Sequence, residues 1–366
     1  MGVAGERFVK DRSDEGLLGG LPKPSELVAD AKQSLGIGPN AREAEETYNK
    51  ADALYREGKF SEARKLFKKA GSHWPDSSLE EDAMFMAAEC DFFSDNYPDA
   101  SDRYANLLRK YENSRHLDTV VSRQFAIARY WLELQQADPQ PFYVPNLTNQ
   151  TKPWWDTTGN AHAVMQSVWI NDPTGPLADD SVLATANDYF VRGRFADADE
   201  YYKQLRDDYP KSEHLANAFL LGIQAKLATY QGPDYDATPL LESEKLIEQA
   251  LLQFPTQLAT ERKRIMETRQ TILKLKAERD WFMAEYFAKN KYFRSAKHYY
   301  EHILKNAPNT EFAARAQARL TEYADMPDEP TSRFQWFIDL FPEGSAQPLG
   351  PVGNTASAPA QGSSRR

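Results

Sequence analysis

Four segments of the chain align with one another without gaps, and this internal repetition constrains the fold more than any other feature of the sequence. Each segment has an aromatic residue, an alanine three positions later and a second aromatic four positions after the alanine. The alanines are Ala63, Ala100, Ala198 and Ala296, and the second aromatics are Phe67, Tyr104, Tyr202 and Tyr300. This spacing places all three residues on one face of a helix. Three of the four segments end at a proline, which predicts the end of that helix, and a Ser or Thr two residues later offers a cap for the next one.

A second apolar face with the same spacing precedes each segment, so each unit is predicted to be a pair of helices. These faces are Tyr48–Ala51–Tyr55, Phe85–Ala88–Phe92, Leu183–Ala186–Phe190 and Trp281–Ala284–Ala288. The alanines mark the places where the two backbones of a pair come closest, since a larger side chain would separate them. Two degenerate copies, one with Ala161 and Met165 and one with Leu240 and Ile247, bring the number to about six. The sequence therefore predicts an all-α solenoid of five to six helical hairpins.

The units divide the chain into four predicted regions. We expect an N-terminal arm over residues 1–41, a repeat domain over 42–324, a short apolar docking segment over 325–342 and a disordered C-terminal tail over 343–366. A loop excursion at 137–158, rich in Pro, Asn and Thr, interrupts the repeats. Before the last repeat, Thr260–Lys289 is predicted to be one long helix with Phe282 among its packed positions.

Charge and cysteine content exclude several classes of function. The formal net charge of −10 disfavours a general binder of nucleic acids or of anionic membranes. The single cysteine, Cys90, permits no intrachain disulfide and no cysteine-based metal cluster, and we expect it to be a half-buried helix residue. No apolar run approaches the ~20 residues that cross a bilayer. The first residues show no export signal and no lipobox.

The repeats resemble the 34-residue tetratricopeptide pattern, which has alanine in both helices and proline at the end. The segments YNKADALYREGKFSEARKLF and ERDWFMAEYFAKNKYFRSAKHYYEHILKNAPNTEFAARA are similar to the BamD (YfiO-type) outer-membrane assembly lipoproteins, over roughly residues 44–322. The resemblance implies a periplasmic scaffold at the outer membrane that binds unfolded β-barrel proteins through its N-terminal repeats and a barrel-forming partner through its C-terminal repeats. The lipidated cysteine of that family has no counterpart here, so membrane association is expected only indirectly or through an anchor absent from this chain.

One motif suggests chemistry. The run from His298 to His302 spells H-x-x-E-H, a zinc-binding motif of one class of metallopeptidase. Tyr300 and Ala296 already belong to the core face, so we expect both histidines on the flank turned away from the partner helix, without a third ligand. We therefore predict no enzyme activity, no metal and no cofactor. A zinc hydrolase at His298 and His302 is the alternative from another class, and a general repeat adaptor of the envelope or cytoplasm is the alternative among binding proteins.

Two surfaces are predicted to bind proteins. The first helices of a solenoid line its groove, which leaves polar side chains and one apolar side chain to hold an extended peptide: Asn49, Asp52, Arg56, Glu89, Phe93 and Asn187. The second surface is the loop with Trp154 and Trp155, which have no role in the repeat. These two indoles either bind a partner or cover an exposed hairpin face. Single residues in the groove could equally be part of a solvated helix face.

Overall fold

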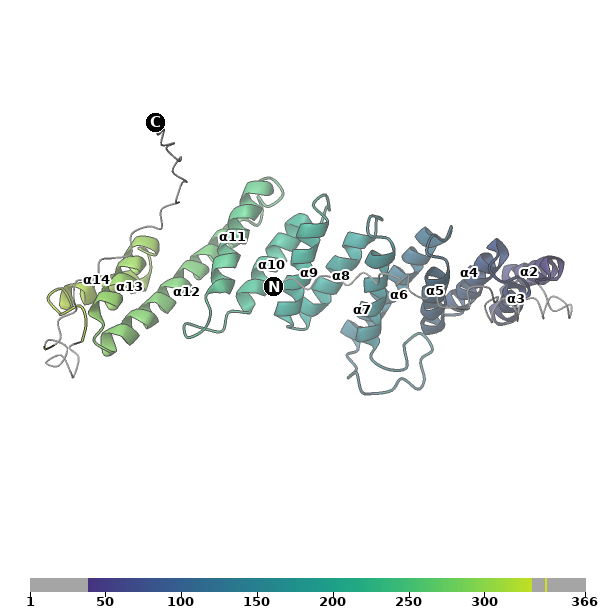
Figure 1. Ribbon diagram of the computed structural model, residues 1–366, viewed down its shortest axis with the longest axis horizontal. Coiled ribbons are helices and arrows are strands. Elements are labelled where there is room, and N and C mark those ends of the chain that lie inside the picture. Colours follow the sequence, from purple (N-terminus) through teal and green to yellow (C-terminus); the bar gives the residue numbers. More distant parts are fainter. Residues whose placement is uncertain (1–38, 331–339, 341–366) are drawn as a thin grey trace, which may run out of the picture. The chain divides into compact units, whose positions relative to one another are not determined.

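The computed structural model describes residues 39–330 and residue 340, and these form helices joined by turns and loops, with no strand among them (Figure 1). The helices in chain order are α2 (Ala41–Arg56), α3 (Phe60–His73), α4 (Ser78–Phe93), α5 (Tyr97–Lys110), α6 (Leu117–Ala137), α7 (Thr157–Asn171), α8 (Ala178–Val191), α9 (Phe195–Asp208), α10 (Leu215–Ala228), α11 (Thr238–Gln253), α12 (Arg262–Lys289), α13 (Phe293–Asn306) and α14 (Glu311–Glu322). The all-α fold of repeated hairpins is confirmed. The described residues form two compact units, one of residues 39–230 and 238–266, the other of residues 231–237 and 267–330.

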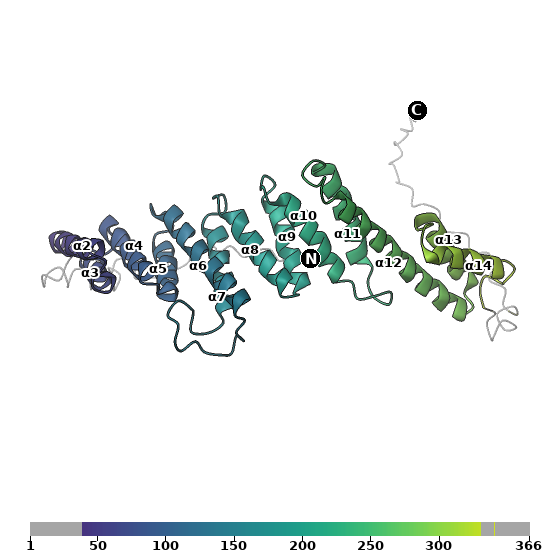
Figure 2. The same ribbon diagram turned by 180° about the vertical axis from the view of Figure 1, so that it is seen from behind.

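In the first unit, α2 to α11 follow one another in chain order, as both views show (Figures 1 and 2). The repeat alanines lie where consecutive helices meet. Those of α2, α4 and α8 are fully buried, as are their counterparts in α3, α5 and α9: Ala51, Ala88, Ala186, Ala63, Ala100 and Ala198. The aromatics four residues after the second set, Phe67, Tyr104 and Tyr202, are also fully buried. The degenerate copies conform too, because Ala161, Met165, Leu240 and Ile247 have no exposed surface. The alanines and second aromatics of the predicted core are therefore confirmed as buried, whereas the other aromatics of the predicted faces are only partly buried.

The turn inside each of the four clear hairpins uses one residue in the left-handed conformation, five residues before the repeat alanine of the second helix. This residue is Gly58, Asp95, Gly193 or Lys291, with φ between 58° and 76°. Glycine adopts this conformation without a steric penalty, whereas a residue with a Cβ does not. The turn geometry is therefore set by the fold, and two of the four repeats accommodate a residue that disfavours it.

The caps expected from the Ser and Thr residues form only in part. Ser77 caps α4 as predicted, since its Oγ accepts from the backbone N of Glu80 at 3.1 Å. Ser114 lies two residues before His116, which is the N-cap residue of α6. Its Oγ accepts a hydrogen bond from the backbone N of His116 at 3.2 Å. Ser212 does the same for His214 at 3.1 Å. These serines shape the turn before the helix, while a histidine takes the N-cap position.

The second unit contains the last hairpin and its flanking helix. Ala284, Ala296 and Tyr300 are fully buried there, as the repeat pattern predicts. The long helix α12 spans 28 residues, close to the predicted range. Phe282 departs from the prediction, because 40% of its surface is exposed. In this part of α12 the buried face follows Ala277 and Ala284, seven residues apart, and Phe282 falls outside that stripe.

None of the described helices is long and apolar enough to cross a membrane. The loop between α6 and α7 covers residues 138–156, close to the predicted excursion. The predicted arm, apart from residues 39–41, lies outside the described residues, as do the tail and most of the apolar docking segment.

Candidate functional site

In three of the four clear repeats, the residue that follows the alanine of the first helix accepts a hydrogen bond from a buried tyrosine. The Tyr202 hydroxyl donates to Asn187 Oδ1 at 2.8 Å, and the Tyr300 hydroxyl donates to Glu285 Oε1 at 2.9 Å. The Tyr104 hydroxyl donates in the same way to Glu89 Oε1. The separation is 15 residues in all three cases. Because the tyrosine rings are fully buried, their hydroxyls need such a partner, and this position of the first helix provides it.

Where the acceptor is a carboxylate, an arginine one repeat later neutralises it. Arg123 Nε and Nη2 donate to the two carboxylate oxygens of Glu89, each at 3.1 Å, across 34 residues. Arg319 Nε donates to Glu285 Oε1 at 3.2 Å, again across 34 residues. Asn187 carries no charge, and the residue 34 positions after it is Leu221. The internal copies therefore vary together: a charged acceptor has a cation opposite, and a neutral acceptor has an apolar side chain.

Because of these contacts, two of the residues predicted to line the groove already have hydrogen-bond partners within the chain. Glu89 was expected to face the groove as a free carboxylate, but it is only 5% exposed and is used by Tyr104 and Arg123. This expectation was wrong, because a tyrosine hydroxyl and an arginine from other helices converge on the position. Asn187 is half-buried and accepts from Tyr202.

The other predicted groove residues lie on or near the surface. Asn49 and Arg56 are exposed, and the Arg56 guanidinium pairs with the Asp52 carboxylate at 2.7 Å. Repeat one has Phe67 in place of the buried tyrosine, so Asp52 has no hydroxyl to serve. Phe93 is 45% exposed. The structure thus leaves Asn49, Asp52, Arg56 and Phe93 accessible.

Phe93 belongs to an exposed aromatic group at the C-terminal ends of α2 and α4. Its ring stacks on Phe60 with centroids 5.9 Å apart and meets Tyr55 edge-on at 6.2 Å. The Arg123 guanidinium lies 5.2 Å from the Phe93 ring centroid and 4.5 Å from that of Phe92. Burial, reinforced by the charge of Glu89, raises the pKa of Tyr55 to about 12. The group is partly apolar, and Phe93 is its side chain most open to solvent.

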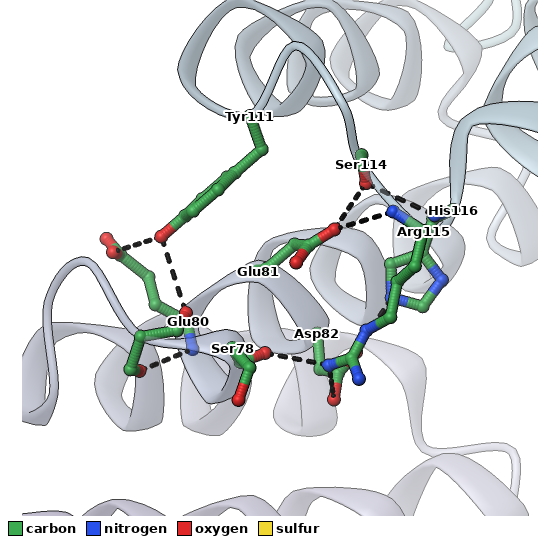
Figure 3. Close-up of polar contacts among 9 residues, drawn as sticks. Ser78, Glu80, Glu81, Asp82, Tyr111, Ser114, Arg115 and His116 are labelled. Carbon is green, nitrogen blue, oxygen red and sulfur yellow. Dashed lines mark hydrogen bonds and ion pairs between the residues drawn. The ribbon is translucent and has the colours of Figure 1, made fainter.

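The junction between successive hairpins is held by polar contacts, which Figure 3 shows for α4 and the turn before α6. Ser114 Oγ donates to Glu81 Oε1 at 2.6 Å, and the backbone N of Arg115 donates to the same oxygen at 3.0 Å. The Tyr111 hydroxyl donates to Glu80 Oε2 at 2.8 Å (Figure 3). The acidic first turn of α4 therefore binds the turn of the next unit, which fixes one hairpin against its neighbour.

A histidine completes this junction and recurs in a second one. His116 Nε2 lies 2.7 Å from Asp82 Oδ1, and His214 Nε2 lies 2.6 Å from Asp180 Oδ1, both across 34 residues. The His116 ring also stacks on Phe85, with centroids 4.1 Å apart. Both histidines occupy N-cap positions, of α6 and α10, and their rings pair with the preceding unit.

The loop of residues 138–156 presents large apolar side chains to solvent. Trp154 is 57% exposed and Trp155 48%, so these indoles do not cover a hairpin face. The exposed set also includes Phe142, Tyr143 and Leu147, each exposed over about two thirds of its surface or more. In both views the loop extends beyond the ends of the helices that it joins (Figures 1 and 2).

The loop is held in one conformation by hydrogen bonds. The backbone N of Asn146 donates to the carbonyl of Trp154 at 2.8 Å, and the Asn146 amide donates to the carbonyl of Lys152 at 3.0 Å. Trp131 Nε1 in α6 donates to the carbonyl of Thr151 at 2.7 Å. Gln150 Nε2 reaches the carbonyl of Ser94, at the end of α4, at 3.2 Å. The exposed aromatics are therefore preorganised, which lowers the entropy lost on binding a partner.

The comparisons with known proteins agree with this periodicity. The tetratricopeptide repeat family model matches residues 48–77 and 180–212. The chain contains tetratricopeptide repeats. No curated protein matches the chain significantly. Among solved structures, the crystal structure of the C-terminal part of a TPR repeat-containing protein from Cytophaga hutchinsonii is 14% identical and covers 74% of this chain and 98% of that chain, with a TM-score of 0.24. A TM-score of this size supports no inference about function.

The tetratricopeptide repeats account for the 34-residue separations in the network. They also explain which contacts sequence reasoning missed. Arg123 and Arg319 could have been found as the residues one repeat length after an acidic acceptor. The exposed Phe142, Tyr143 and Leu147 lie outside the repeats, and their one visible signal was an apolar composition in a Pro-rich segment.

The two histidines of the H-x-x-E-H motif lie on α13 and have different surroundings. His302 was expected to turn away from the partner helix, but its Nδ1 lies 2.6 Å from Asp280 Oδ2, in that helix. His298 is exposed. Across residues 39–330, no group of three or more His, Cys, Asp and Glu side chains could hold a metal ion. The geometry gives no support to a zinc hydrolase at these histidines.

Cys90 is fully buried rather than half-buried. Burial, together with the charge of neighbouring Asp91, raises the pKa of its thiol to about 12. Such a thiol is protonated at neutral pH and is a poor nucleophile.

Proposed function

We propose that this chain is a non-enzymatic scaffold that binds other proteins during the assembly of β-barrel proteins into the outer membrane. Tetratricopeptide repeats are protein-interaction modules, and the chain contains them. The outer-membrane role is supported by the similarity of residues 44–322 to the BamD-type lipoproteins. Its clients are then unfolded outer-membrane proteins, and its stable partner is a β-barrel assembly protein on the periplasmic side. Contact with the membrane is indirect or through an anchor.

The observation that carries protein binding is the ordered loop of residues 138–156. A soluble surface rarely leaves five large apolar side chains on one short segment exposed to water, because each exposed side chain has an unfavourable hydration free energy. Trp and Tyr are the residues that contribute most to binding energy when a partner covers them. The hydrogen bonds of Asn146 and Trp131 hold the loop ready for such a partner.

The accessible residues of the first helices add a second surface to this proposal. Asn49, Asp52, Arg56 and Phe93 offer amide, charged and apolar groups to an extended peptide. Asn187 contributes only an amide edge, since its oxygen already accepts from Tyr202. Glu89 is no longer included, because it is buried and paired. We assign client contact to these side chains and partner docking to the loop.

A photo-crosslinking experiment tests the proposal. A photoreactive phenylalanine analogue replaces Phe142 in the loop, and crosslinking is done in intact cells. We expect a crosslinked product that contains a β-barrel assembly protein. Trp154→Ala with Trp155→Ala should abolish this product, whereas Leu252→Ala, which removes an exposed side chain 82% accessible in α11, should not.

Two results would contradict the proposal. A product that contains only a cytoplasmic protein would favour the general adaptor instead. Crosslinks that persist unchanged in the double variant would show that the loop aromatics do not bind the partner. Circular dichroism of the variants confirms that each is folded.

A further inference from the structure

A cavity of about 670 Å³ lies between α9, α10 and α11 in the first unit. It is large enough to hold several residues of a peptide. Its apolar lining includes Leu215, Phe219, Leu246 and Phe254, and the rings of Phe219 and Phe254 lie 5.6 Å apart. The sequence does not predict this cavity, because the residues that line it come from three helices and share no local pattern.

Arg206 of α9 lines this cavity and has no carboxylate partner. Its Nη1 donates to the carbonyl of Ala218 at 3.1 Å, and its guanidinium lies 5.4 Å from the Phe219 ring centroid. Within the part of the chain that the structure describes, no acidic group comes within ion-pair distance of it. A half-buried guanidinium with one neutral hydrogen bond leaves most of its five N–H donors without a strong acceptor. Burial lowers the pKa of Arg206 from its usual value, and the charges of Asp199 and Asp207 offset only part of this effect.

The neighbouring cation in the same cavity shows the contrast. Lys226 Nζ lies 2.7 Å from Asp199 Oδ2 and 2.5 Å from Glu242 Oε2, so it is paired with two carboxylates. Both carboxylates are therefore ion-paired with Lys226, and the second oxygen of Asp199, Oδ1, is buried without a hydrogen-bond partner. Acidic and basic side chains are equally frequent around the cavity, so a general positive potential is not what distinguishes it. The distinguishing feature is one desolvated guanidinium beside an apolar floor.

The neighbouring helix α10 has a glycine where the Arg206 side chain packs against it. Gly222 lies in the middle of α10, where glycine disfavours a helix by about 1 kcal/mol relative to alanine. A Cβ placed at Gly222 would lie 2.4 Å from Arg206 Nη1. Because Gly222 has no side chain, the Arg206 guanidinium can lie against α10 at this position.

The position is special to this repeat. Arg206 falls eight residues after Ala198, and the same offset in the other three clear copies gives Gly71, Leu108 and Leu304. A leucine at this position is compatible with the repeat fold, so packing does not require an arginine. The cation is an addition of the fourth repeat, and the glycine that faces it belongs to α10 of the next hairpin.

We propose that this cavity binds an extended acidic peptide segment of a partner protein, with a carboxylate on the Arg206 guanidinium and an adjacent apolar side chain on the floor formed by Phe219 and Phe254. A carboxylate matches the planar fork of guanidinium donors. The apolar side chain gains from leaving water. The site goes beyond the proposed function, since it lies apart from the loop of residues 138–156 and does not depend on the compartment.

The test uses a fluorescein-labelled peptide of sequence Ala-Phe-Asp-Leu-Glu-Ala, blocked at both ends, and a second peptide with Asn and Gln in place of Asp and Glu. Binding to the full chain is measured by fluorescence anisotropy. We expect saturable binding of the acidic peptide and at least tenfold weaker binding of the amide peptide. Arg206→Leu, the residue that two other repeats carry, should weaken the acidic peptide at least tenfold, and Arg206→Lys should be intermediate.

Matched variants keep the test specific. Arg129→Leu removes an exposed arginine of α6 that pairs with Glu133 and should leave binding unchanged. Gly222→Ala displaces the guanidinium without removing its charge, and should weaken binding although alanine favours the helix. Thermal unfolding by circular dichroism verifies that every variant is folded. Trp154→Ala with Trp155→Ala should bind the peptide normally, so failure here and failure of the proposed function are distinguishable.

Several outcomes would overturn the proposal. Equal binding of the two peptides would make the cavity a purely apolar site. Unchanged affinity in Arg206→Leu would place the peptide elsewhere. Competition by inorganic phosphate at the same concentration as the acidic peptide would indicate a simple anion site. Absence of binding of the acidic peptide at millimolar concentration would exclude the site as drawn.

Discussion

The guanidinium of Arg123 forms two parallel hydrogen bonds, each of 3.1 Å, with the carboxylate of Glu89 one repeat earlier. The same carboxylate also accepts from the buried Tyr104 hydroxyl. Burial, reinforced by the charge of Glu89, raises the pKa of Tyr104 far above its usual value, so this hydroxyl stays protonated and can donate. A core tyrosine, an acid and an arginine from three helices therefore connect two adjacent repeats.

Removal of Arg123 should destabilise the protein, because the buried carboxylate of Glu89 would lose its ion-pair partner. Arg123→Leu leaves a buried carboxylate without its cation, and we expect a loss of about 2 kcal/mol, which allows for the partial exposure of Arg123. The loss is measured as a shift of the urea midpoint followed by circular dichroism.

The fourth repeat supplies the matched control. Glu89→Asn combined with Arg123→Leu copies the pair Asn187 and Leu221 and should recover at least half of the lost stability. If the double variant is less stable than the single one, the covariation of the internal copies has another origin.

A glycine in the hairpin turn of the last repeat should make the protein more stable. Lys291 holds φ of +65°, at the position where two other repeats have glycine. The left-handed conformation costs a residue with a Cβ roughly 1–2 kcal/mol, while glycine adds entropy to the unfolded chain. Lys291→Gly should therefore stabilise the protein by about 0.5–1 kcal/mol.

The reverse change serves as its control. Gly193→Ala at φ of +73° should destabilise by about 1 kcal/mol, although open space surrounds the position. In thermal unfolding, Lys291→Gly should raise the unfolding temperature and Gly193→Ala should lower it. Destabilisation by Lys291→Gly would refute the conformational explanation.

Helix contact in the fourth repeat should not tolerate a larger residue. Ala198 is fully buried where α8 and α9 meet, so Ala198→Leu inserts three carbon atoms into a packed interface and should cost about 2–3 kcal/mol. Ala196→Leu in the same helix lies on the exposed side and should change stability by less than about 0.5 kcal/mol. Chemical denaturation of both variants measures the difference, and similar losses would show that helix propensity rather than packing decides.

The thiol of Cys90 should be inert in the folded protein. It is fully buried, and its pKa of about 12 leaves almost no thiolate near neutral pH. An aromatic disulfide that releases a yellow thiolate on reaction should therefore modify Cys90 only as fast as the protein locally unfolds. In denaturant it should modify Cys90 completely. Immediate stoichiometric reaction of the native protein would mean that this part of α4 is open in solution.

The repeat and the buried alanines and aromatics of its core could be predicted from the sequence. The i, i+3, i+7 spacing of Ala63, Phe67 and their counterparts is a property of a single helix, so it can be counted along the chain without knowing the neighbours. For the same reason the long loop around Trp154 was recognised by the break in that spacing.

Pairs of polar residues were not readable in this way. Glu89 was assigned to an open groove because it adjoins the core stripe of its own helix, but its surroundings are made by Tyr104 and Arg123 from other helices. His302 was assigned to a free flank and instead reaches Asp280. The orientation of such side chains depends on how three helices converge.

The sequence by itself determined that this chain folds as helical hairpins with small residues at their contacts, because helix periodicity and side-chain volume act locally. Only the tertiary structure decided which charges are paired and which stay open, as for Glu89 beside Arg123 and for Arg206 across Gly222. The physical reason is that the electrostatic interaction and burial of a polar side chain depend on its distance to groups from other helices, and that distance exists only once the helices have packed.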